Sequence, residues 1–93
     1  MIIIGKDDFK RIKKIGKGKV AIDFHGLPTA RAVRLMHSYI EVFRPEEILA
    51  IHGFHRGTSI RDALTQKRLT VWPYSVIPDQ RNKGVTRFVF RAA

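Results

Sequence analysis

The feature that most constrains the fold is the segment 51–61, which reads IHGFHRGTSIR. An apolar run over residues 47–51 leads into it, and apolar residues at helical spacing follow it. The glycines inside the segment therefore indicate a tight loop between a buried strand and a helix. The N-terminus of a helix presents backbone N–H groups and the positive end of its dipole, which suits an anion such as a phosphate.

A second strand end lies upstream, where a short apolar run covers residues 20–24. Asp23 and His25 stand at its end and are two residues apart, so on a strand their side chains share a face. Apolar residues at helical spacing over 29–43 predict a helix between this strand and the strand at 47–51. We expect the two strand ends to lie side by side and to form one site.

The rest of the chain completes an α/β pattern. A helix is expected from Ser59, with Asp62 as its capping-box partner, to Arg68. Strands are expected over 74–77 and 86–91, on either side of a turn rich in Asp, Asn and Gly. The order β-α-β-α-β-β predicts a two-layer sandwich, in which two helices cover one face of a four-stranded mixed sheet. Residues 20–93 are expected to form this single domain.

Residues 1–19 are expected to form a basic N-terminal arm. Seven of the eighteen Lys and Arg residues fall within residues 6–19. Phe9, Ile12 and Ile15 recur at near-helical spacing, which predicts a short helix that docks through these side chains. A solvated, partly frayed N-terminus is the alternative. In the functional interpretation, the arm contacts phosphates without sequence preference.

The net charge of +10 makes a polyanion, most often nucleic acid, the expected partner. Simple solubility by charge is the alternative. We expect no membrane partner, because the apolar opening MIII is too short for a span and no helix shows a broad exposed apolar face. The chain lacks cysteine, which excludes disulfides and thiolate metal sites and fits a reducing compartment. A monomeric cytoplasmic protein is the resulting expectation.

Two motifs at these strand ends resemble those of the small MutS-related (Smr) domain. Residues 22–26 read Ile-Asp-Phe-His-Gly, where the family has Leu-Asp-x-His-Gly. Residues 52–57 read His-Gly-Phe-His-Arg-Gly, where the family has His-Gly-x-Gly-x-Gly, so His55 takes the place of the middle glycine. Residues 82–86, Asn-Lys-Gly-Val-Thr, are similar to the family's closing turn. The resemblance covers roughly residues 20–91 and leaves the basic arm outside.

The resemblance implies a fold similar to the C-terminal domain of translation initiation factor three. It also implies nucleic-acid binding and, as in many members of the family, endonuclease cleavage or nicking. Some members act on mRNA at stalled or collided ribosomes, and others have been linked to DNA. The ribosome is therefore a candidate partner of this chain.

Cleavage of a phosphodiester needs a base, an acid and donors around the phosphoryl oxygens. Histidine suits both proton roles, so His25 and His52 are the candidate acid and base, with Asp23 to orient His25. The alternative is that Asp23 and His25 only fix the adjacent loop. Phosphate contacts are expected from the loop, the helix start and the arm, namely Gly53, His55, Arg56, Gly57, Thr58, Arg61, Arg11, Lys13 and Lys14.

Asp23, His25 and His52 could supply ligands to a metal, but they lack the close pair spacing of a usual metal site. We therefore expect a metal-independent mechanism and no cofactor, with a metal site as the alternative. RNA is favoured over DNA as the substrate, because its own 2′-hydroxyl can act as the nucleophile without a metal. The resemblance and these residues together predict an Smr-type endonuclease that cleaves RNA or, alternatively, nicks DNA. The alternative is a non-catalytic module that binds RNA or the ribosome.

Overall fold

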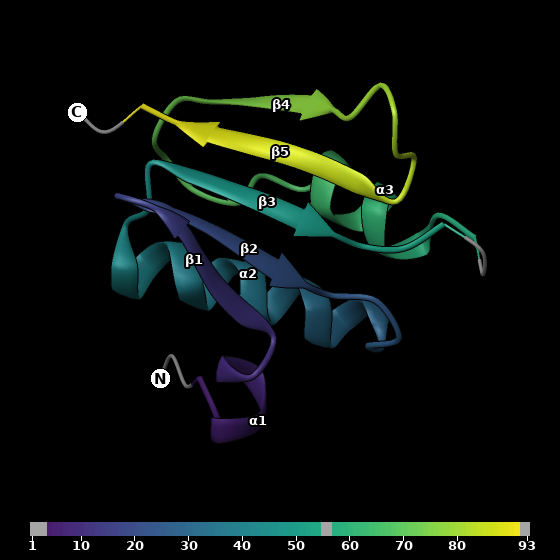
Figure 1. Ribbon diagram of the computed structural model, residues 1–93, viewed down its shortest axis with the longest axis horizontal. Helices are drawn as coiled ribbons and strands as arrows, with labels where there is room; N and C mark the ends of the chain where they lie inside the picture. Colours follow the sequence, from purple (N-terminus) through teal and green to yellow (C-terminus); the bar gives the residue numbers. More distant parts are fainter. Residues whose placement is uncertain (1–3, 55–56, 92–93) are drawn as a thin grey trace.

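The computed structural model describes residues 4–54 and 57–91 and has two layers, a sheet and the helices behind it (Figure 1). The described part of the sheet has five strands in the order β1-β2-β3-β5-β4. Strands β2 and β3 are parallel, and the other neighbouring pairs are antiparallel, so the sheet is mixed. The strands are β1 (Ile12–Gly16), β2 (Lys19–Asp23), β3 (Glu47–Ile51), β4 (Tyr74–Pro78) and β5 (Val85–Phe90).

Three helices are present in the described residues: α1 (Lys6–Phe9), α2 (Thr29–Phe43) and α3 (Ser59–Gln66). The bounds expected for α2 and β3 are confirmed: α2 has strong helical periodicity, and β3 is a short apolar run. The helix α3 is shorter than expected and ends at Gln66 rather than Arg68. None of the described helices combines the length and the apolar character that crossing a bilayer requires.

The α/β class with a mixed sheet is confirmed, but the expected count of four strands and two helices is wrong. The difference lies in the expected arm, where residues 12–16 form β1, an edge strand paired antiparallel with β2. The short helix comes earlier in the chain, as α1. The register of β1 shifts between Lys14 and Gly16, where a β-bulge places one extra residue in the strand. The strand therefore lacks regular alternation, and the three-residue spacing of Ile12 and Ile15 resembles that of a helix.

The core lies between the sheet and the two longer helices. Side chains alternate along each strand, so every second residue faces α2 and α3. The buried side chains on this face come from β2, β3 and β5, and they pack against those of α2 and α3: Val20, Ile22, Ile48, Ala50, Thr86, Phe88, Phe90, Leu35, Met36, Ile40 and Leu64.

The opposite side of the sheet, here called the open face, is covered by none of the described helices (Figure 1). Lys13, Ala21, Leu49 and Arg87 form one row across it, because they are register partners on four adjacent strands. Lys13 and Arg87 are exposed. The open face therefore carries the exposed cation of Lys13 and the Arg87 guanidinium, whose Nη1 lies 4.0 Å from Oε1 of Glu47.

Candidate functional site

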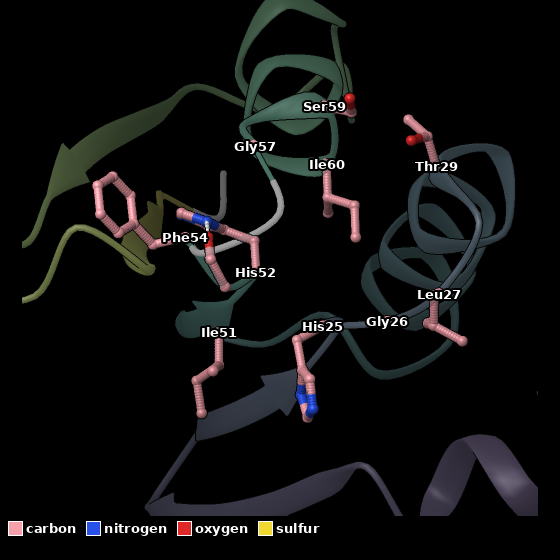
Figure 2. Close-up of a pocket in the computed structure, with 11 residues that line it drawn as sticks. His25, Gly26, Leu27, Thr29, Ile51, His52, Phe54, Gly57, Ser59 and Ile60 are labelled. Atoms are coloured by element: carbon pink, nitrogen blue, oxygen red, sulfur yellow. Dashed lines mark hydrogen bonds between the residues drawn. The ribbon is translucent and has the colours of Figure 1, made fainter.

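The two predicted strand ends lie side by side. Asp23 and Ile51 are register partners in the parallel pair β2–β3, and the N–H of Phe24 donates to the carbonyl of Ile51 at 2.7 Å. A pocket of about 700 Å³ opens beyond these ends, and both His25 and His52 line it (Figure 2). The parallel pairing thus brings together the two motifs that the sequence separates by a whole helix.

Asp23 and His25 form a carboxylate–imidazole pair on the open-face side of the strand end. The backbone N–H of His25 donates to Oδ1 of Asp23 at 3.1 Å, and Nδ1 of the ring donates to the same oxygen. The His25 side chain is 66% exposed. Because Asp23 occupies Nδ1, the nitrogen left to meet solvent or a substrate is Nε2, which is the arrangement of an imidazole oriented for proton transfer.

Arg11 holds this strand end in place. Its Nη1 donates to the carbonyls of Asp23 and His25, each at 3.0 Å, and its own carbonyl accepts from the N–H of Asp23. Arg11 was expected to contact phosphates, and the structure shows it bonded to the backbone that carries the pair. Lys13 and Lys14 are exposed on β1, and Lys13 pairs with Ala21, which lies on the same face as Asp23.

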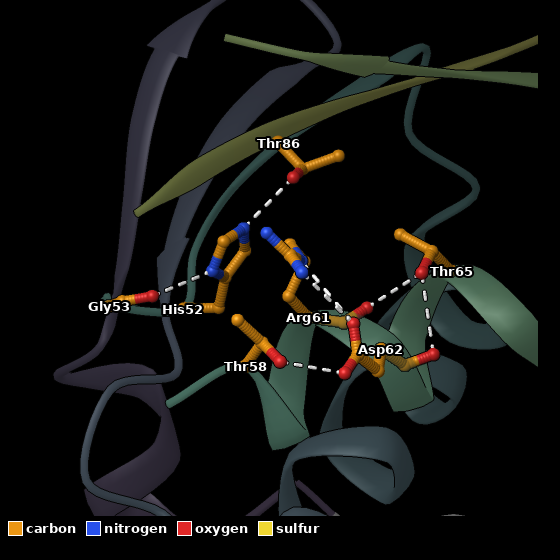
Figure 3. Close-up of polar contacts among 7 residues, drawn as sticks. All are labelled: His52, Gly53, Thr58, Arg61, Asp62, Thr65 and Thr86. Atoms are coloured by element: carbon orange, nitrogen blue, oxygen red, sulfur yellow. Dashed lines mark hydrogen bonds and ion pairs between the residues drawn. The ribbon is translucent and has the colours of Figure 1, made fainter. Parts of the chain in front are cut away.

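His52 occupies a different environment from His25. It is only 5% exposed, on the side of the sheet that faces the helices, and its imidazole points away from that of His25 (Figure 2). Its Nδ1 donates to the carbonyl of Gly53, and the hydroxyl of Thr86 donates to its Nε2, each at 2.9 Å (Figure 3). The structure therefore brings the two strand ends together but does not bring the two imidazoles face to face.

The pKa of His52 is lowered from the ordinary value, chiefly because burial disfavours the charged ring. The hydrogen bond to the carbonyl of Gly53 raises the pKa of His52, and the positive charge of Arg61 lowers it further. A neutral ring with both nitrogens engaged in hydrogen bonds holds the loop in place and has no nitrogen open to a substrate. His52 thus has the surroundings of a positioning residue.

The glycine loop is built by close backbone contact with a distant turn. The N–H groups of His52 and Gly53 both donate to the carbonyl of Gly84, at 2.9 and 3.1 Å. A Cβ on Gly84 would lie 3.2 Å from the carbonyl carbon of Gly53, and one on Gly53 would lie 3.3 Å from Cβ of His25. Gly57 donates its N–H to the carbonyl of Phe54 at 3.3 Å. Both loop glycines that were expected to cradle a phosphate thus have internal partners for their N–H groups.

The start of α3 is organised by Asp62 (Figure 3). The hydroxyl of Thr58 donates to Oδ2 of Asp62 at 2.7 Å, while Nε and Nη2 of Arg61 donate to Oδ1 at 3.3 and 3.2 Å. The Thr58 bond, together with those from Arg61, lowers the pKa of Asp62. The expected capping pair of Ser59 and Asp62 is therefore wrong, since Asp62 bonds Thr58 instead. Thr58 and Arg61 were both expected to contact a phosphate, and in the structure their side chains donate hydrogen bonds to the carboxylate of Asp62.

His55 and Arg56 lie outside the described residues. Sequence reasoning missed the pocket's apolar walls, which include Leu27, Phe54 and Ile60. It also missed Lys83, whose Nζ lies 5.6 Å from the ring centre of Phe54. The available signal was Phe54 itself, a large apolar residue in a loop of otherwise polar and small residues.

Within residues 4–54 and 57–91, no group of three or more His, Asp and Glu side chains is placed to hold a metal ion. Comparison with known proteins finds no match: no family model, no curated protein and no solved structure matches this chain significantly. The resemblance to the Smr domain therefore rests on the motifs at residues 22–26, 52–57 and 82–86.

Proposed function

We propose that the protein is an RNA endonuclease of the Smr type in which His25 is the general base. The observation that carries this proposal is the exposed Asp23–His25 pair, whose Nε2 is left open at a strand end flanked by basic residues. Nε2 takes the proton of a 2′-hydroxyl, and the resulting oxygen attacks the adjacent phosphorus. The bond to the 5′ oxygen breaks, and that oxygen takes a proton from solvent. The products are a 2′,3′-cyclic phosphate and a 5′-hydroxyl.

Asp23 has two tasks in this reaction. Its carboxylate fixes the ring so that Nδ1 carries the proton and Nε2 is the acceptor, and its negative charge stabilises the imidazolium that forms. Arg11 holds the backbone of both residues, and Lys13 and Lys14 attract the polyanionic substrate. The excess of positive charge over the whole chain works in the same direction.

RNA is the favoured substrate because, of the imidazoles that the structure describes at the site, only that of His25 is exposed. RNA carries its own nucleophile, so one base is enough to start the reaction. DNA has no 2′-hydroxyl, and its hydrolysis needs a positioned water and a further group beside the leaving oxygen. His52 is buried and bonded at both nitrogens, so it does not supply that group. A reducing compartment such as the cytoplasm fits a chain without cysteine, and the ribosome remains a candidate place of action.

The test is incubation of the purified protein with end-labelled single-stranded RNA. We expect cleavage that leaves cyclic-phosphate ends and that is absent when the 2′-hydroxyls are methylated. His25→Ala should lower the cleavage rate by roughly 10²- to 10⁴-fold while RNA binding is kept. The matched control is His37→Ala, which removes an exposed histidine on α2. Cleavage of the methylated RNA, or full activity in His25→Ala, would contradict the proposal.

A second candidate is a non-catalytic module that binds RNA or the ribosome. The burial of His52 favours it, because a nuclease of the acid–base kind usually exposes two proton-transfer groups, and of the two motif histidines that the structure describes only His25 is exposed. This candidate predicts tight, salt-sensitive binding to RNA with no products after long incubation. The assay above therefore separates the two candidates directly.

A further inference from the structure

The pocket beside the Asp23–His25 pair has a feature that phosphate chemistry does not explain. Its volume of about 700 Å³ falls within the range of small-molecule sites, and several of its walls are apolar. Leu27 comes from the turn before α2, Ile60 from the first turn of α3, and Phe54 from the glycine loop (Figure 2). A site that bound only a sugar–phosphate backbone would have little use for such walls.

Polar groups stand at the rim of the pocket and positive charge lies beside it. Thr29 and Ser59 begin α2 and α3, and their side chains lie across from each other where the two helices start (Figure 2). The Phe54 ring is 46% exposed, with the ammonium group of Lys83 near it. The pocket therefore combines an apolar interior with two hydroxyls, and an exposed aromatic ring and a cation lie at its outer edge. His25, the proposed base, is at the same rim.

We propose that this pocket binds one unstacked base of a single-stranded RNA, so that the phosphodiester of the same nucleotide lies at His25. The inference rests on the proposed function and names the part of the substrate that the site selects. Single-stranded RNA is typically recognised by bases that leave the stack, lie against aromatic rings and hydrogen-bond through their edges. Leu27 and Ile60 exclude water, and the hydroxyls of Thr29 and Ser59 face the base edge. The ring of Phe54 is turned away from Ile60 and lies at the outer edge of the pocket, where it offers a surface for stacking (Figure 2).

The charge of the surroundings argues for a base attached to a polyanion rather than for an uncharged ligand. The chain carries a net charge of +10, and Lys83 lies over Phe54 at the pocket. An apolar group carried on a phosphate chain matches an apolar pocket in a basic surface. The stacking of each base on an aromatic side chain is worth about 1–3 kcal/mol, enough to set where a flexible strand is held.

The experiment compares the binding of two oligomers of about eight nucleotides, both methylated at every 2′-hydroxyl so that no cleavage occurs. One carries bases and the other is abasic throughout, so the two have equal charge. We expect the abasic oligomer to bind roughly five- to 150-fold more weakly at the same salt concentration, as the loss of base stacking predicts. A panel of four homopolymers would show which base the pocket prefers.

Variants then locate the effect. Ile60→Phe fills the pocket and should reduce the affinity for the base-bearing oligomer to that for the abasic one. Phe54→Ala, at a half-exposed position that tolerates truncation, should weaken binding by roughly tenfold even if Ile60→Phe folds poorly. The matched control is Val42→Phe, which adds the same ring to an exposed position in the last turn of α2 and should change nothing.

Equal affinity for the two oligomers would overturn the pocket assignment, as would Ile60→Phe and Phe54→Ala variants that bind like Val42→Phe. These results are independent of catalysis because the oligomers cannot be cleaved. If the protein discriminates between the oligomers but leaves unmodified RNA intact, the pocket assignment stands and the proposed nuclease activity is wrong. If it cleaves RNA but binds both oligomers equally, the nuclease activity stands and the pocket assignment is wrong.

Discussion

The hydroxyl of Thr86, on β5, donates a hydrogen bond of 2.9 Å to Nε2 of His52, just beyond the end of β3. With Nδ1 bonded to the carbonyl of Gly53, the ring of His52 is held as one neutral tautomer at the base of the glycine loop. His52 thus fixes the loop, while His25, from the other motif, is exposed beside it. The two histidines that the sequence presents as equivalent differ in what they can do.

The burial of His52 makes the stability of the protein depend on pH. Its pKa in the folded protein lies below the value of 6.5 expected for an unperturbed histidine, so the unfolded chain binds the proton more tightly. The stability from the neutral ring is complete above pH 6.5 and is lost as the pH falls toward the lowered folded-state pKa. Urea denaturation at about pH 8 and about pH 5 should show this loss.

His52→Gln should remove most of this pH dependence, whereas His37→Gln, at an exposed position on α2, should keep it. An unchanged pH dependence in His52→Gln would show that another group is responsible. Carboxylates also titrate near the lower of the two pH values. The effect of His52 is therefore read from the difference between the two variants, and not from the wild-type protein alone.

Gly53 and Gly26 test whether the loop must lie close to His25. Both have positive φ angles, +83° and +78°, so alanine at either position is strained by about 1–2 kcal/mol. A Cβ on Gly53 would also lie 3.3 Å from Cβ of His25, whereas one on Gly26 would meet nothing within 4 Å. We therefore expect Gly53→Ala to lower the free energy of unfolding by more than Gly26→Ala, as measured by urea denaturation. Equal losses would mean that the crowding at His25 has no energetic effect.

Asp23→Asn should separate catalysis from binding. The amide keeps the shape of the carboxylate but loses the charge that stabilises the imidazolium, so the cleavage rate should fall by roughly 10²-fold or more. The affinity for methylated RNA should stay within about twofold, because Asp23 is not a phosphate ligand. Asp7→Asn, which changes an exposed carboxylate on α1, is the control. A parallel fall in affinity would indicate that Asp23 acts on RNA binding or on folding rather than on His25.

Lys13 should contribute to RNA binding through charge alone. It is exposed on β1, and its register partner Ala21 is on the same face as Asp23. Lys13→Ala should weaken binding to all RNA sequences alike and make the plot of log affinity against log salt concentration shallower by about 0.7. Lys67→Ala, just after α3 at the far end of that helix from the pocket, should leave the slope unchanged. Identical slopes for wild type and Lys13→Ala would remove β1 from the RNA interface.

The parts of the fold that the sequence predicts best are those with one buried face. The helix α2 shows regular periodicity because it has one side in the core and the other outside, and the strand β3 is an apolar run in the middle of the sheet. The strand β1 has no such pattern. It is an edge strand with exposed Lys13, Lys14 and Ile15, and its bulge breaks the alternation that would identify it. Local sequence alone could not distinguish it from a short basic helix.

The site was predictable in its position but not in its orientation. Motif spacing and the βαβ connection placed the ends of β2 and β3 together, as the structure has them. The side of the sheet was harder to assign, yet period-two alternation contained the information. Ala50 is in the core, so His52 points there too, whereas Ile22 in the core places Asp23 on the open face. The pocket's apolar walls depend on how two helices pack, which no local pattern encodes.

The carbonyl of Gly84 accepts hydrogen bonds from the N–H groups of both His52 and Gly53. The turn over residues 79–84, before β5, therefore fixes the position of the glycine loop, although none of its residues lines the pocket. Lengthening or shortening that turn by a single residue would tilt the mouth of the pocket without changing any residue that lines it. Insertions there would change the shape of the proposed RNA site without replacing any residue of that site.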